Sequence, residues 1–147
     1  DRAKKVRVGG TLSGNPLTCL AGCTVIQELE KRNAHEKLKA AADEFTKKLV
    51  ELADKYDVPA IIFNQHSILH IDVSGMQHIP TFFENPSSQE CKNRVVEATQ
   101  ATMEFAMALA AEGVIIAGGN KSYINIETID LLDEVLAAYE RVFKEFE

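Results

Sequence analysis

The chain has 147 residues, a length typical of a single domain with a sizeable buried core. Apolar residues make up 46% of it and charged residues 26%, which is typical of globular proteins and excludes an intrinsically disordered chain. The net charge of −6 argues against nucleic-acid binding, and no apolar run reaches the roughly 20 residues of a membrane-spanning helix. We therefore expect neither nucleic acid nor a membrane as a partner.

The three cysteines favour free thiols. Cys19 and Cys23 lie four residues apart on an expected helix, a spacing that suits a disulfide poorly, and Cys91 is far along the chain. Free thiols are typical of the reducing cytoplasm, where we expect the protein to work. No CxxC pair is present, so no cysteine metal site is expected. Because the chain begins at Asp1 without a signal-like segment, we expect it to be part of a longer protein.

A basic lead-in, residues 1–8, precedes the densest cluster of special residues, Gly9–Pro16. Its glycines allow tight turns and the close approach of a neighbour or ligand. Asn15 is expected to cap a helix that begins at Pro16. A glycine-rich turn before a helix N-terminus predicts an anion site, because free N–H groups and the helix dipole point at it. A turn and a helix cap without a ligand would explain the same residues.

The glycine spacing is similar to that of a nucleotide-binding P-loop. Gly9 and Gly14 are five residues apart, but Asn15 and Pro16 stand where that motif requires Lys and Ser or Thr. A nucleotide P-loop is therefore excluded.

Two helices follow. The first, residues 16–32, has a broad apolar face, and Gly22 within it predicts close packing against another element. The second, residues 34–56, has apolar residues three and four apart, which predict one buried stripe and a charged outer face. The stripe of the second helix comprises Leu38, Ala42, Phe45, Leu49, Leu52 and Tyr56.

Residues 60–63 and 67–73 are expected to form a hairpin, with a turn at 64–66. Alternation in the second strand places Leu69, Ile71 and Val73 on one face and Ile68, His70 and Asp72 on the other. His70 and Asp72, with His66 and His78 nearby, could ligate zinc or form an acid–base pair. Because no metal-ligand spacing is matched, we favour residues that simply line the wetter sheet face, and no metal is expected.

A long connection, residues 75–88, carries the exposed-looking Phe82 and Phe83 and suggests a functional loop or a surface that packs on another domain. A third helix should run from a cap at Ser87 or Ser88 to about residue 112 and stop at Gly113. Its expected inward residues are Val95, Met103, Ala106, Leu109 and Ala110, and Met103 and Met107 are interpreted as core or interface filling.

Strands at 114–117 and 122–126, joined by a turn, should form a second hairpin, and Thr128 should cap a final amphipathic helix. Helices separated by hairpins predict an α+β fold with a small, mainly antiparallel sheet covered on one face by helices. We divide the chain into residues 1–15, the lead-in and glycine-rich loop, and residues 16–147, a small domain.

Gly9–Pro16, followed by Leu17 and the pair Ala21-Gly22, resembles the start of the C-terminal small domain of class III pyridoxal-phosphate aminotransferases, which are fold-type I enzymes. A threonine followed two residues later by Ser-Gly-Asn-Pro most resembles the glutamate-1-semialdehyde 2,1-aminomutase branch. The resemblance extends over nearly the whole chain, although only this first motif is specific. It implies the same α+β architecture and a parent enzyme that moves an amino group through cofactor imines.

The resemblance also implies a role for Thr11. In this family the matching threonine reaches across a homodimer interface, and its hydroxyl and N–H bind the phosphate of the neighbouring subunit's pyridoxal 5′-phosphate. Thr11, with Gly10 giving access, is therefore the expected cofactor-binding site. The family's catalytic lysine and the acidic partner of the pyridine nitrogen lie in the large domain, upstream of this motif. No catalytic residue is assigned here, and the isolated chain is expected to be inactive.

The last third departs from the aminomutase pattern. That branch carries Pro-Ser and a Glu after the Gly-Val strand, then Ala-His-Thr before the last helix, whereas residues 117–120 read Ala-Gly-Gly-Asn and residues 124–126 read Ile-Asn-Ile. A class III transaminase with another substrate is therefore the near alternative. A stand-alone α+β interaction or ligand-binding domain without chemistry is the alternative from a different class.

Overall fold

The structure is a computed structural model that describes residues 9–74 and 87–145. The chain separates into two compact units, Asp1–His35 and Glu36–Glu147, and each is described by itself. The division at residue 15 that the sequence suggested stays a prediction. Most of the expected connection at 75–88, with His78, Phe82 and Phe83, lies outside the described residues.

The first unit contains helix α1, Pro16–Lys31, which begins and ends within one residue of the prediction. No residue of α1 is buried, so its broad apolar face is exposed. Nothing lies within 4 Å of a Cβ built on Gly22, so the expected close packing is also missing. The apolar pattern correctly indicates a helix that needs partners, but the described residues of this unit supply none.

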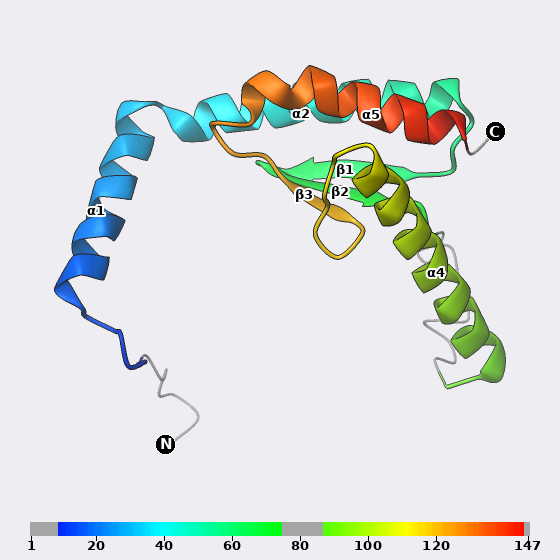
Figure 1. Ribbon diagram of the computed structural model, residues 1–147, viewed down its shortest axis with the longest axis horizontal. Helices are drawn as coiled ribbons and strands as arrows, with labels where there is room; N and C mark the ends of the chain where they lie inside the picture. Colours follow the sequence, from blue (N-terminus) through cyan, green and yellow to red (C-terminus); the bar gives the residue numbers. More distant parts are fainter. Residues whose placement is uncertain (1–8, 75–86, 146–147) are drawn as a thin grey trace. The chain divides into compact units, whose positions relative to one another are not determined.

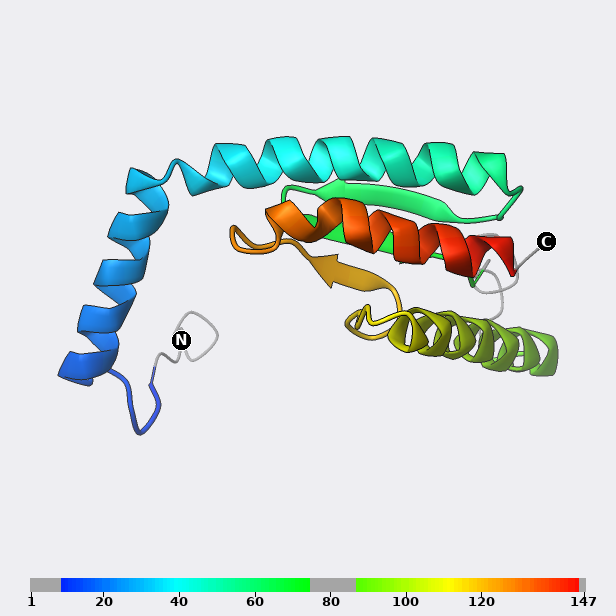
Figure 2. The same cartoon turned by 45° about the horizontal axis from the view of Figure 1, so that its top comes forward.

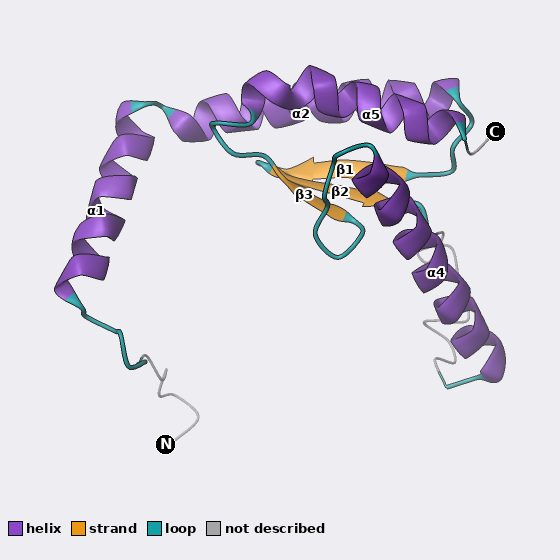
Figure 3. Ribbon diagram, viewed as in Figure 1, coloured by secondary structure: helices purple, strands orange, loops and turns teal. Residues whose placement is uncertain are grey.

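The second unit is an α+β layer, as predicted. Strands β1 (Ile61–Gln65), β2 (Ile68–Asp72) and β3 (Lys121–Tyr123) form an antiparallel sheet in the order β1-β2-β3. Helices α2 (Ala34–Lys55) and α5 (Leu132–Lys144) run side by side over one face of that sheet, as Figures 1 and 2 show. A further helix, α4, spans Gln89–Ala111. Figure 3 colours the helices purple and the strands orange.

The hairpin of β1 and β2 confirms which residues of the second strand were predicted to lie on each face of the sheet. Ile62 pairs with Ile71 and Asn64 with Leu69, and both Leu69 and Ile71 are buried beneath the helices. His70 lies on the opposite face, as alternation along a strand requires. His66 at the turn has a φ of 53°, the left-handed conformation that tight hairpins demand.

The second predicted hairpin is only partly right, because Ala117 and Lys121 close the expected turn and residues 121–123 form a strand. Residues 114–116 form no strand, and Ala117 makes only an isolated bridge to Lys121. The reason is the closure of α4, in which Gly113, at a φ of 86°, donates its N–H to Ala110 and Val114 donates its N–H to Leu109. The N–H groups of Gly113 and Val114 are therefore bonded to carbonyls at the end of α4, and β3 pairs with β2 instead.

The start of the last helix also differs from the prediction. The side chain of Thr128 caps no helix N–H. The Oδ1 atom of Asn125 accepts the N–H groups of Glu127 and Thr128, and a short 3₁₀ turn, Ile129–Leu131, leads into α5. Asn125 accepts these N–H groups because its side chain reaches the backbone that follows it.

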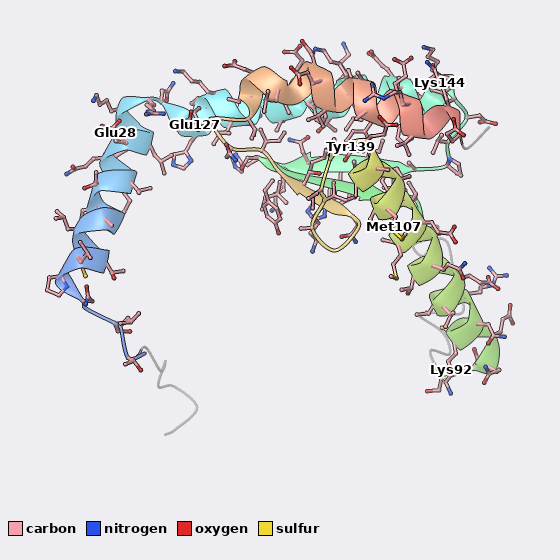
Figure 4. All side chains as sticks on the ribbon, viewed as in Figure 1. Glu28, Lys92, Met107, Glu127, Tyr139 and Lys144 are labelled. Carbon is pink, nitrogen blue, oxygen red and sulfur yellow. The ribbon has the colours of Figure 1, made fainter. Side chains whose placement is uncertain are left out.

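An aromatic cluster forms the centre of the core. Tyr139 lies 6.0 to 6.3 Å, between ring centroids, from Phe45, Phe105 and Phe143, and all four rings are buried. Figure 4 places Tyr139 on the inner side of α5. Burial raises the pKa of the Tyr139 hydroxyl to about 12, opposed by its contact with Ser122. The buried stripes predicted for α2 and α5 are confirmed by this cluster.

The prediction for α4 is only partly right. Leu109 is buried and Ala106 packs on the core, but Met103 and Met107 are exposed. Met107, labelled on α4 in Figure 4, is 68% exposed. Core filling by these methionines is therefore wrong within the described residues.

Candidate functional site

Two consecutive turns form the glycine-rich loop before α1. The Ser13 N–H donates to the Gly10 carbonyl at 2.9 Å, and the Asn15 N–H donates to the Leu12 carbonyl at 3.2 Å. Gly14 occupies the third position of the second turn with a φ of 74°, where a side chain would be strained. Thr11 lies at the second position of the first turn, so the turn projects its side chain outward.

Asn15 closes the N-terminus of α1, as predicted. Its Oδ1 atom accepts the N–H groups of Leu17 at 3.0 Å and Thr18 at 3.2 Å, and its carbonyl accepts the Cys19 N–H. Pro16 has no N–H to offer. The prediction that free N–H groups at the helix end would hold an anion is therefore wrong, because the cap has already taken them.

Unbonded donor groups remain in the loop, although the donors of the helix end are already bonded. Within the described residues, neither the hydroxyl nor the backbone N–H of Thr11 has a hydrogen-bond partner, and Thr11 is exposed. No charged residue occurs from Gly9 to Gln27, so no carboxylate of this segment repels an anion. The positive end of the α1 dipole adds a weak attraction. These features fit a phosphate group held by Thr11.

Contacts within the described chain do not require glycine at positions 9 and 10. Nothing lies within 4 Å of a Cβ built on Gly9, and a Cβ on Gly10 would meet only the Ser13 Oγ at 3.5 Å, an ordinary contact. Neither glycine has a positive φ. The missing side chains therefore leave space for an approaching external group.

The histidine cluster suggested by the sequence does not assemble into a metal site in the described part of the chain. The His70 ring stacks on Phe63, with 4.7 Å between ring centroids, on the outer sheet face. Asp72 accepts the N–H and hydroxyl of Ser74. Among the described residues, no group of three or more His, Cys, Asp and Glu side chains could hold a metal ion.

One polar cluster was missed by sequence reasoning. Glu140 of α5 accepts from Lys55 Nζ at 2.8 Å and from the Tyr56 hydroxyl at 2.7 Å, both at the end of α2. The hydrogen bond from Lys55, then that from Tyr56, lowers the pKa of Glu140 to about 2. No local pattern connects residues 84 and 85 positions apart. The cluster fastens α2 to α5 and gives no sign of chemistry.

Comparison with known proteins finds glutamate-1-semialdehyde 2,1-aminomutases among the relatives of this chain, although no family model matches it. A glutamate-1-semialdehyde 2,1-aminomutase of Legionella pneumophila (strain Paris) is 28% identical over 108 residues. One of Methanococcus maripaludis is 32% identical over the same length. Each match covers 74% of this chain but 23% of the relative, so the chain spans about a quarter of the length of these relatives.

The fold has a solved counterpart. An omega-transaminase from Sphaerobacter thermophilus matches with a TM-score of 0.63 and 17% identity, over 93% of this chain and 30% of that one. At this identity the match shows a shared fold. No described helix is long and apolar enough to cross a membrane. The predicted resemblance is thus confirmed: in sequence and in fold this chain resembles the C-terminal region of class III pyridoxal-phosphate aminotransferases, and its sequence relatives include glutamate-1-semialdehyde 2,1-aminomutases.

Proposed function

We propose that this chain is the C-terminal domain of a pyridoxal-phosphate-dependent enzyme of the cytoplasm that moves an amino group, as an aminomutase or an aminotransferase. Similarity to aminomutases over 74% of the chain supports this class of reaction. The observation that carries the cofactor assignment is Thr11, whose hydroxyl and N–H have no partner in the described structure. A hydroxyl and an N–H on one exposed turn suit a phosphate dianion.

This chain's own residues would bind and orient the cofactor's phosphate. Thr11 would donate its hydroxyl and its N–H, while Gly10 would let the phosphate approach the backbone. Pyridoxal phosphate, when bound, supplies an electron-withdrawing ring that weakens the bonds of an amino-bearing carbon. We propose that the phosphate belongs to the neighbouring subunit of a homodimer.

No residue of this chain is assigned a covalent or proton-transfer role. A reactive lysine needs a pocket that activates it, and we expect that lysine in the preceding part of the longer enzyme. The chain by itself should therefore be inactive.

An aminotransferase with another substrate is the second candidate. The segment 117–126, which departs from the aminomutase pattern, and a structural neighbour named as a transaminase favour it. The two reactions differ in their stoichiometry. An aminomutase isomerises glutamate 1-semialdehyde without a second substrate, whereas a transaminase needs a separate amino donor and acceptor.

The test is an absorbance spectrum of the full-length protein purified with pyridoxal phosphate. We expect a visible band that borohydride abolishes, leaving one modified lysine outside these 147 residues. If the native product is this chain alone and it takes up no cofactor, the proposal is wrong. The alternative of a stand-alone, non-catalytic domain would then replace it.

A further inference from the structure

A crevice of about 230 Å³ lies in the second unit beside β3. Its walls come from residues 113–115 after α4, from residues 122–124 of β3 and its continuation, from the start of α5, and from Phe45 of α2. A complete second hairpin would have paired the first two of these segments directly. Residues 113–115 form no strand, because the N–H groups of Gly113 and Val114 are bonded to the end of α4. The crevice is therefore open where a strand ladder would have closed it.

Apolar side chains form most of the lining of this crevice, and none of the described residues that line it carries a charge. The apolar members are Phe45, Val114, Ile115, Ile124, Leu132 and Val135. Such a lining offers no partner to an ion and favours a neutral molecule. Its volume is below the roughly 300–1,000 Å³ of sites for drug-sized ligands. A cavity of about 150 Å³ with a similar lining holds benzene, so the crevice suits a molecule of about one ring.

One hydroxyl on the lining has an incomplete hydrogen bond. Ser122 Oγ lies 3.5 Å from the hydroxyl oxygen of Tyr139, beyond the roughly 2.5–3.0 Å that is usual between two hydroxyls. The Tyr139 side chain is fully buried, and three other aromatic rings pack around it and hold it in place. Ser122 Oγ has no other hydrogen bond among the described residues. The Thr128 hydroxyl, also on the lining, donates to the Asn125 carbonyl at 3.0 Å and accepts the Asn125 N–H at 3.1 Å. Of these two hydroxyls, that of Ser122 is therefore the one available to an occupant.

We propose that this crevice binds a small neutral molecule that has an apolar body and one hydroxyl or carbonyl oxygen. The apolar body contacts the side chains of the lining, and the oxygen completes the hydrogen bonding of Ser122. The lining residues all belong to the second unit, whereas Thr11 belongs to the first. The inference therefore goes beyond the proposed function and does not depend on it.

Phenol and benzene are the matched probes, because they share a ring and differ by one hydroxyl. The experiment titrates each into the full-length protein, labelled at its isoleucine methyl groups, and follows these groups by nuclear magnetic resonance. We expect phenol to shift the signals of Ile115 and Ile124, which line the crevice, with a Kd on the order of 1 mM. Phenol should bind about 3- to 10-fold more tightly than benzene, as one neutral hydrogen bond predicts. Ile26, exposed on α1, is the control for adsorption to apolar surfaces and should not shift.

Ser122→Ala should lower the affinity for phenol to that for benzene and leave benzene binding unchanged. The proposal is overturned if neither Ile115 nor Ile124 shifts, because the crevice is then closed or filled in the full-length protein. A shift of Ile26 in step with theirs also overturns it, as does a preference for phenol that survives in Ser122→Ala. The unsubstituted protein decides the matter even if that variant fails to fold, since phenol binding no tighter than benzene there contradicts the role of Ser122. The cofactor spectrum reports separately on the proposed function.

Discussion

The Oδ1 atom of Asn15 accepts the backbone N–H of Leu17 at 3.0 Å. This single contact changes how the glycine-rich segment is understood. Together with the bonds from Thr18 and Cys19 to Asn15, it leaves no free N–H donor at the start of α1, so the proposed phosphate site rests on the turn around Thr11. In this motif the first N–H groups of α1 are bonded to Asn15, whereas the hydroxyl and N–H of Thr11 have no partner among the described residues.

Asn15→Ala should loosen the first turn of α1. Leu17 and Thr18 would lose their acceptor, at a cost of about 1 kcal/mol to the helix. Hydrogen exchange of these two amides should become faster. Asn15→Asp keeps an acceptor oxygen and should leave their exchange near the original rate. Equal exchange in Asn15→Ala and the unsubstituted protein would contradict the assigned cap.

Gly119→Ala should destabilise the second unit severely. A Cβ there would lie 2.6 Å from Thr102 Cγ2 and 3.0 Å from its carbonyl oxygen, at a φ of 76°. Steric overlap and backbone strain together should cost roughly 2–5 kcal/mol in urea unfolding. Gly113→Ala is the matched control, because its φ is 86° but nothing lies within 4 Å. It should cost only about 1–2 kcal/mol. Equal losses would mean that the contact with α4 is not tight.

Glu140→Gln should reduce the acid sensitivity of the fold. The folded pKa of Glu140 is lowered from 4.5 to about 2, so the unfolded state binds more protons between these values. The stabilisation is present above about pH 4.5 and is lost as the pH falls towards 2. The urea midpoint should therefore drop more between pH 6 and pH 3 in the unsubstituted protein than in the variant.

Two controls accompany that measurement. Glu97→Gln, on the exposed surface of α4, should keep the full acid dependence. Because the Glu140 side chain is 34% exposed, the effect should be modest and should shrink in high salt. If the Glu140→Gln variant has the same acid dependence as the unsubstituted protein, Lys55 and Tyr56 do not favour the charged form of Glu140.

Local chemistry made much of the fold predictable. Asn15 and Pro16 mark the start of α1 because a cap and a fixed φ act within one turn, and Gly113 marks the end of α4 for a similar reason. The faces of β2 follow from strict alternation. The α+β class followed from the order of these elements.

The predictions that failed involved backbone N–H groups that bond elsewhere, or contacts between residues far apart in the sequence. Val114 is β-branched and apolar, but its N–H closes α4, and residues 114–116 form no strand. At the approach to α5, the Asn125 side chain accepts the N–H groups of Glu127 and Thr128, and the Thr128 side chain caps no helix N–H. The ion pair of Lys55 and Glu140 joins residues 85 positions apart, and no local pattern records it. At the candidate site, the roles of Thr11 and Gly10 stay predictions, whereas the expected free N–H groups at the start of α1 are bonded to Asn15.

Gly10→Ala should separate fold from ligand access. The added Cβ would make only an ordinary contact with Ser13 Oγ, so the urea midpoint should change little. In the full-length protein, however, the methyl group would stand where the cofactor's phosphate approaches. Equilibrium dialysis should then show weaker binding of pyridoxal phosphate. Unchanged binding would mean that Gly10 is not part of the site.

The most direct test of the central claim compares two ligands on the Thr11 variants of the full-length protein. Thr11→Ala should weaken binding of pyridoxal phosphate by roughly 10- to 100-fold, the value of a hydrogen bond to a charged group. It should leave binding of pyridoxal, which lacks the phosphate, unchanged, and Thr11→Ser should restore most of the affinity. If Thr11→Ala binds pyridoxal phosphate as tightly as the unsubstituted protein, or loses both ligands equally, Thr11 does not hold the phosphate and the proposed site is wrong.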